Sequence, residues 1–172
     1  MSLGQRIAVA ALGLSAAGLV GIAHYEGYSD RAISPVPGDV PTIGFGSTRH
    51  ADGRPVKLGE TIPPPKALAL AARDVAVKEG ELKRCLSGVM LYQHEYDAFV
   101  DLAYNVGPGA VCRSSIPKKL AAGDFEAACK TILDFRKVQG RDCSLPENQH
   151  FCGGVWTRRK AMAHLCLTGE RP

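Results

Sequence analysis

The chain has 172 residues, which is enough for one domain with a hydrophobic core and too few for two domains of ordinary size. Its composition, 45% hydrophobic and 22% charged, is that of a globular protein and indicates no particular chemistry. The net charge of +4 fits either a mildly basic solvated surface or an anionic partner such as nucleic acid, anionic lipid or an acidic cell-wall polymer. Neither a phosphate-binding loop nor a nucleic-acid-binding module is present, so we expect no nucleotide cofactor and no nucleic-acid partner.

An apolar stretch without charges covers residues 7–23, with Arg6 before it and Glu26 shortly after it. Its 17 residues are at the lower limit of the length that spans a bilayer as a helix. Ten of the 17 are Ala, Gly or Ser, so the stretch is less hydrophobic than a permanent anchor. Arg6 on the short flank predicts that the N-terminus stays inside and that the rest of the chain is exported.

Several interpretations of this stretch stay open. A cleaved signal peptide would have a longer basic region and a clear small-x-small cleavage site. The others are a stable anchor, a weak anchor that can leave the membrane, and an ordinary buried Ala-rich helix. Gly13, Ala17 and Gly21 share one helix face, which allows close contact with another helix. We divide the chain into an N-terminal export helix over residues 1–23 and a folded domain over residues 24–172.

Turn-forming residues alternate with short extended pieces over residues 28–48. Pro35 and Pro37 exclude a helix, and the Pro-Gly pair before Asp39 marks a turn. We therefore expect a small hairpin or three-stranded sheet, followed by a polar loop over residues 49–65.

Helical spacing of apolar residues begins at Lys66. It predicts a helix that breaks near Gly80 and a second helix that stops at about Gly107. A short helix through Leu120, capped by Ser114 or Ser115, a helix capped by Asp124, and a last one over about residues 157–167 follow. The fold class is therefore α+β, with a small N-terminal β lobe and a larger helical lobe. The cleft between two such lobes is where a substrate site is expected.

Six cysteines lie in the second half of the chain: Cys85, Cys112, Cys129, Cys143, Cys152 and Cys166. Their even number and the lack of a CxxC pair indicate disulfides, and hence an oxidising compartment. Closeness in sequence favours pairing Cys143 with Cys152 and Cys112 with Cys129, which leaves Cys85 with Cys166. A metal site at Cys143, His150 and Cys152 is the alternative, but no fourth ligand is evident, so we expect no metal.

Glu26, Asp39 and Thr42 together could perform acid–base chemistry. A carboxyl group on Glu26, beside apolar surface, would hold its proton, whereas Asp39 in a polar turn would stay ionised. Glycosidic bond cleavage uses such a pair, one group to protonate the leaving oxygen and the other to activate a water. Thr42 adds a hydroxyl that could orient that water. Turn formation by Asp39 and strand formation by Thr42 explain the same residues without catalysis.

The stretch YEGYSDRAISPVPGDVPTIGFGST, residues 25–48, resembles the N-terminal signature of phage-type lysozymes, glycoside hydrolase family 24. In that signature a helix-ending Glu-Gly is followed by a hairpin and a Thr-x-Gly-x-Gly strand. QHEYDAFVDLAYNVGPGAVCRSSIPKKLAAGDFEAA is similar to the family's central buried helix and the helix pair after it, and GGVWTRRKAMAHLC to its closing Arg-Arg helix. The likeness covers residues 24–167 in the right order. It implies a lysozyme-like muramidase that hydrolyses the β-1,4 bond between N-acetylmuramic acid and N-acetylglucosamine in peptidoglycan, with inversion.

The resemblance assigns roles residue by residue. Glu26 matches the family's general acid and Thr42 its threonine. The family usually places its aspartate nine residues after the Glu and six before the Thr, where this chain has Pro35 and Val36. We expect Asp39 to supply the aspartate's function from a shifted position in the turn.

Some enzymes of this family carry a weakly hydrophobic signal-anchor-release segment, which residues 7–23 resemble. This implies export to the host periplasm, an initial tether to the inner membrane through the N-terminal helix, and peptidoglycan as the substrate; we expect a monomer. With the helix in the bilayer, Glu26 would be held against the membrane and its site left incomplete. No cysteine lies in residues 1–84, so activation would come from helix refolding and not from thiol exchange.

The main interpretation is a phage or prophage endolysin that lyses a Gram-negative host. A lytic transglycosylase, which needs the acid but no water-activating aspartate, is an enzymatic alternative. A non-catalytic wall-binding accessory is an alternative of another class.

Overall fold

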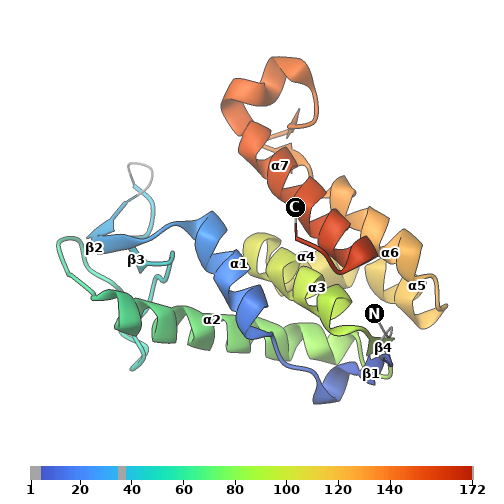
Figure 1. Cartoon of the computed structure of the whole chain (residues 1–172). Coiled ribbons are helices and arrows are strands. Elements are labelled where there is room, and N and C mark those ends of the chain that lie inside the picture. The colour runs from blue at the N-terminus through green and yellow to red at the C-terminus, as the bar shows by residue number, and fades with distance from the viewer. Residues whose placement is uncertain (1–4, 35–37, 172) are drawn as a thin grey trace. The chain divides into compact units, whose positions relative to one another are not determined.

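The computed structural model describes residues 5–34 and 38–171, and the chain divides into two compact units (Figure 1). The helical unit comprises residues 1–18 and 78–172, and the hairpin unit comprises residues 19–77. Two helices, α1 (Ala16–Glu26) and α2 (Pro64–Cys85), continue from one unit into the other. Helices joined to short strands confirm the predicted α+β class.

The predicted hairpin is present in the hairpin unit. Strand β2 (Ser29–Ile33) pairs antiparallel with β3 (Thr42–Gly44), with Ser29 opposite Gly44 and Ile33 opposite Thr42. The register shifts between these two pairs, so the ladder is irregular. A small apolar core supports the hairpin: Ala32, Ile43, Val56, Ile62, Ala67 and Leu70, with Phe45 packed against it.

Helix α2 begins at Pro64, two residues before the predicted start, because proline in a first helical turn needs no hydrogen-bond partner for its nitrogen. The predicted break near Gly80 was wrong, and the helix continues to Cys85. A glycine inside a helix costs only about 1 kcal/mol relative to alanine. The burial of Val75 and Leu82 on either side of it outweighs that cost.

The helical unit is built around α3 (Gln93–Val106), whose residues 95–104 are all buried. Helix α7 (Gln149–Thr168) packs against α3 and α6, as Figure 1 shows. Gly107, with φ of +85°, ends α3 where the sequence predicted a stop. The remaining helical elements are α4 (Pro108–Arg113), α5 (Ile116–Ala121), α6 (Phe125–Thr131) and the 3-10 turn η2 (Ile132–Asp134). Asp124 caps α6 as predicted, since its Oδ1 accepts the Ala127 N–H at 3.2 Å.

The last helix starts earlier than the sequence suggested. A 3-10 turn, η3 (Pro146–Asn148), leads directly into α7 at Gln149, and the helix is kinked at Cys152, where φ is −144°. The loop before it contains an unpredicted hairpin, β5 (Lys137–Val138) paired with β6 (Arg141–Asp142). Strands of two residues are too short to show an alternating pattern in the sequence.

Residues 7–23 do not form the single helix that their apolar character predicts. Strand β1 (Ile7–Ala8) pairs antiparallel with β4 (Met90–Leu91), the 3-10 turn η1 (Val9–Ala11) follows, and α1 begins only at Ala16. Hydrogen bonds to α3 stabilise this conformation: Arg6 donates to Glu95, and the Ser15 N–H donates to Asp97. Over the part of the chain that the structure describes, no helix combines the length and the apolar character needed to cross a bilayer.

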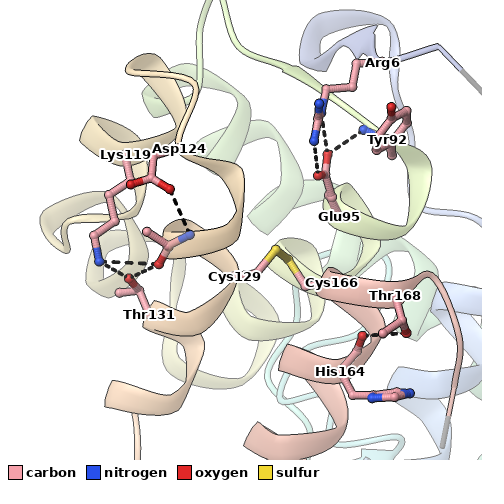
Figure 2. Close-up of a disulfide and its surroundings, with 11 residues drawn as sticks. Arg6, Tyr92, Glu95, Lys119, Asp124, Cys129, Thr131, His164, Cys166 and Thr168 are labelled. Atoms are coloured by element: carbon pink, nitrogen blue, oxygen red, sulfur yellow. Dashed lines mark hydrogen bonds and ion pairs between the residues drawn. A yellow bond between two sulfur atoms is a disulfide. The ribbon is translucent and has the colours of Figure 1, made fainter. Parts of the chain in front are cut away.

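Three disulfides cross-link the helical unit: Cys85–Cys112, Cys129–Cys166 and Cys143–Cys152. The pairing of Cys143 with Cys152 was predicted correctly, which also removes the proposed metal ligands, and the other two predicted pairs were wrong. Closeness in sequence misled because α6 and α7 lie side by side, with the Cα atoms of Cys129 and Cys166 5.5 Å apart (Figure 2). Among the described residues, no group of three or more His, Cys, Asp or Glu side chains could hold a metal ion.

Candidate functional site

Glu26 is the last residue of α1, as the sequence predicted for the end of the apolar stretch. Gly27 follows with φ of +69°, a left-handed conformation that ends the helix, and its N–H donates to the Ala23 carbonyl at 3.2 Å. The Glu26 side chain is partly buried. Its carboxylate is therefore fixed at a helix end and remains accessible.

The segment after Thr42 forms a closed turn against this carboxylate. Ile43 and Ser47 exchange two backbone hydrogen bonds, of 2.9 and 3.1 Å, around residues 44–46. Gly46 has φ of +85°, and a Cβ placed on it would lie 3.5 Å from Glu26 Oε2. The structure thus brings the predicted acid together with the glycine turn that Thr42 begins.

Thr42 is the first residue of β3 and is partly buried. Asp39 lies exposed in the connection between β2 and β3, where the Ser34 hydroxyl donates to its backbone carbonyl at 2.9 Å. Pro35 and Val36, which stand where the family's aspartate is expected, are outside the described residues, as is Pro37. This contact involves the Asp39 backbone only, and Asp39 itself is exposed.

The helical unit carries a second polar cluster on α3 and α7. Arg158 donates to Asp101 at 2.7 Å, and both residues are buried. Arg159 is also buried and donates to the Phe135 carbonyl at 2.9 Å and to the Asn105 side-chain oxygen. Burial, together with the neighbouring Arg158 charge, lowers the pKa of the Arg159 guanidinium to about 10, so it still carries its charge at neutral pH.

A hollow of about 540 Å³ lies beside this cluster and was not foreseen from the sequence. Asn105, whose side-chain oxygen accepts a hydrogen bond from Arg159, is part of its lining. The hollow is lined by Asn105, Val106, Asp134, Phe135, Lys137, Val138, Val155 and Arg159. Lys137 and Val138 come from the unpredicted β5–β6 hairpin, so no sequence pattern indicated this feature.

The chain is similar to several phage endolysins. The endolysin of Salmonella phage P22 is 33% identical over 129 residues, which cover 75% of this chain and 86% of the relative. A SAR-endolysin of Escherichia phage 933W is 29% identical over 157 residues, covering 85% of this chain and 77% of the relative. The solved endolysin of Escherichia coli O157:H7 phage FAHEc1 superposes with a TM-score of 0.80 at 29% identity, covering 94% of this chain and 98% of that one. A sequence model described as phage lysozyme matches residues 23–161, which contain both Glu26 and the glycine turn. The chain belongs to the phage lysozyme family.

Proposed function

We propose that the protein is an endolysin that hydrolyses the β-1,4 bond between N-acetylmuramic acid and N-acetylglucosamine in peptidoglycan. The observation that carries this proposal is the contact of the Glu26 carboxylate with the Gly46 turn, inside the segment that matches the family. A carboxyl group fixed at a helix end and still accessible can protonate the leaving oxygen of a glycosidic bond.

In this proposal, three residues each have one role in the reaction. Glu26 donates the proton to the departing sugar oxygen. The Asp39 carboxylate removes a proton from a water that attacks the anomeric carbon from the opposite face, which gives inversion. The Thr42 hydroxyl orients that water. These catalytic residues belong to a domain that we place over residues 24–172, acting as a monomer.

The first prediction concerns hydrolysis of purified Gram-negative sacculi by the oxidised protein. Glu26→Gln should lower the rate of turbidity clearing by at least about a hundredfold, because general acid catalysis contributes that much or more. Asp39→Asn should lose most of the rate. Asp52→Asn is the matched control, since Asp52 is an exposed aspartate of the same unit, paired with Arg54. Full clearing by Glu26→Gln would contradict the assignment of the acid.

A lytic transglycosylase is the second candidate, and the position of Asp39 favours it. The residue is exposed and displaced along the turn from the family's position, and a transglycosylase needs no water-activating carboxylate. In that case Asp39→Asn keeps full activity and the products end in 1,6-anhydro sugars. Reducing ends in the product, with activity lost in Asp39→Asn, identify a hydrolase.

We also infer export to the host periplasm and an initial tether to the inner membrane through residues 7–23. Relatives named SAR-endolysins support this inference. Helix α1 supports it too, because it is apolar on both faces: Ile22 is fully buried, while Val20 is 66% exposed. A helix that only packed on its own protein would carry polar residues on the exposed face. The three disulfides fit an oxidising compartment.

A further inference from the structure

A second hollow, of about 290 Å³, lies in the hairpin unit and is lined by the loop after the glycine turn and by the first half of α2. Its floor is apolar and is formed by Ala51, Ile62, Ala69 and Leu70. The volume is close to the roughly 300 Å³ at which small-molecule sites begin. The hollow belongs to the same compact unit as Glu26, so a ligand bound in it would be attached to the unit that carries the proposed acid.

Cationic and imidazole side chains form the rest of the lining: Lys66 and Arg73 on α2, and His50 on the loop. The acid that contacts His50, Glu60, lies 2.6 Å from its ring and also accepts the Lys57 N–H at 3.1 Å. Within the part of the chain that the structure describes, neither Lys66 nor Arg73 forms an ion pair with a carboxylate. The hollow therefore combines an apolar floor with positive charge that the protein itself does not neutralise.

The loop side of the hollow is held in place by hydrogen bonds. The His50 N–H donates to the Arg54 carbonyl at 2.9 Å. The Val56 N–H donates to the Thr48 carbonyl, also at 2.9 Å. Arg73 Nη1 donates to the His50 carbonyl at 2.6 Å and so joins the loop to α2. Because the walls form without a ligand, little ordering is needed for one to bind.

The position of Lys66 is not explained by helix stability. It is the third residue of α2, and the first turn of that helix contains no acidic residue. The N-terminal end of a helix carries a partial positive charge, so a cation in the first turn is unfavourable for the helix. The Lys66 side chain is also exposed, and it packs little apolar surface. A role in binding an anion accounts for a lysine at this position.

The two cations set the spacing of the anions that they could bind. Lys66 and Arg73 are seven positions apart on α2, which places their Cα atoms about 10 Å apart along the helix axis. An extended peptide advances about 3.3 Å per residue, so about three residues cover this distance. Between the two cations, Ala69 presents only a methyl group to the hollow. The hollow thus fits a short peptide of small residues with carboxylates about three residues apart.

We propose that this site, the Lys66–Arg73 hollow, binds a peptide stem of peptidoglycan through its carboxylates. The inference rests on the action on peptidoglycan proposed above. Peptide stems of that polymer are short, contain small residues such as alanine, and carry several free carboxylates, so they have the required chemistry. A stem bound here keeps the hairpin unit, and with it Glu26, on the polymer between cleavage events. Because the cations are exposed, the binding weakens as salt is added.

The test titrates the tetrapeptide L-Ala-γ-D-Glu-meso-diaminopimelate-D-Ala into the purified full chain carrying Glu26→Gln, and follows backbone amides by NMR. The amides of Ala51 and Ala69 should shift. Lys66→Glu should weaken the affinity by at least about threefold, because one exposed charge pair is lost and a repulsion is added. Lys57→Glu is the matched control, since Lys57 is an exposed lysine of the same unit outside the lining.

Two further probes test the chemistry of the ligand. The same peptide with its carboxylates amidated should not bind, and binding as tight as that of the acid would overturn the proposal. Decanoate represents an anionic amphiphile, and shifts of Ala51 and Ala69 at lower decanoate than peptide concentrations would assign the hollow to lipid instead. Equal affinities of Lys66→Glu and Lys57→Glu would also overturn the proposal, as would peptide shifts that leave Ala51 and Ala69 unmoved.

Ala69→Leu fills the hollow without changing its charge. Leucine is a good helix former, so α2 should persist, and thermal unfolding checks that it does. The peptide-induced shift at Ala51 should disappear in this variant, and its persistence would contradict the site.

The titration involves no hydrolysis, so its result is independent of the muramidase assignment, which the sacculus assay tests. In a chain that keeps Glu26, Lys66→Glu should raise the sacculus concentration at half-maximal clearing and leave the maximal rate unchanged, because Lys66 binds the substrate away from the reacting bond. A lower maximal rate with an unchanged half-maximal concentration would contradict a role in binding alone.

Discussion

Two glycines in the turn after Thr42 are required for different reasons. Gly44 has φ of +67°, and a Cβ on it would lie 2.8 Å from the Ala67 Cβ, so it lets β3 approach α2 closely. Gly46, with a similarly positive φ, faces the Glu26 carboxylate instead. One glycine therefore serves packing and the other serves the site.

Gly46→Ala should slow the clearing of sacculi, and the slowing should exceed what its loss of stability explains. The methyl group enters the space beside Glu26 Oε2, while the positive φ adds roughly 1 kcal/mol of strain. Gly53→Ala is the matched control, because Gly53 has φ of +86° and a Cβ there meets nothing within 4 Å. Clearing rates and thermal unfolding of both variants make the comparison. If the two variants clear sacculi equally fast, the turn at Gly46 does not influence the catalytic role of Glu26.

The β5–β6 hairpin owes its stability to one aspartate as well as to its short ladder. Asp142 accepts hydrogen bonds from the Ser144 hydroxyl at 2.6 Å, from the Ser144 N–H and from Arg136 at 2.9 Å. These bonds lower the pKa of the Asp142 carboxyl to about 2. The hairpin contributes Lys137 and Val138 to the lining of the hollow beside Asn105. Loss of the hairpin would therefore change that lining.

Acid should loosen this hairpin over a defined range. Because the folded-state pKa of Asp142 lies below the ordinary value of about 3.9, its stabilisation is present above about pH 4 and is lost as the pH falls toward about 2. Asp142→Asn should lower the melting temperature at pH 5 and show a weaker fall between pH 4 and pH 2. Glu170→Gln, at an exposed position, is the control. Parallel melting curves for wild type and Asp142→Asn across this range would contradict the assignment.

Sequence patterns predicted the elements whose causes are local. The apolar face of α3 and the cap at Asp124 follow from neighbouring residues, and so does the placement of Glu26 at a helix end. The conformation of residues 7–23 depends on hydrogen bonds to Glu95 and Asp97, which are distant from them in sequence. The Glu26–Gly46 contact, the Asn105 hollow and two of the disulfides are long-range in the same way. Short patterns carry no information on such contacts.

All six cysteines belong to the helical unit, so the two units differ in covalent support. The Cys129–Cys166 bond joins residues 37 apart in sequence, which is the longest of the three closures. A closure of that length is expected to stabilise the folded state by about 3–4 kcal/mol, chiefly by restricting the unfolded chain.

Removing this disulfide should destabilise the helical unit selectively. Replacing Cys129 and Cys166 together by Ser should speed hydrogen exchange of buried amides in α3 and α7. Amides of the hairpin unit, such as Ile43, should change little. The variant that replaces Cys143 and Cys152, which closes only 9 residues, is the control and should show a smaller effect. Equal acceleration in both units would show that they open together.

The division into two units has an optical consequence. The single tryptophan of the chain, Trp156, lies on α7, and residues 19–77 contain none. Tryptophan emission during denaturation therefore reports on the helical unit alone, whereas far-ultraviolet circular dichroism collects signal from helices of both units. The difference in urea concentration between the unfolding midpoints of these two signals measures how strongly the units are coupled. No added fluorophore is needed.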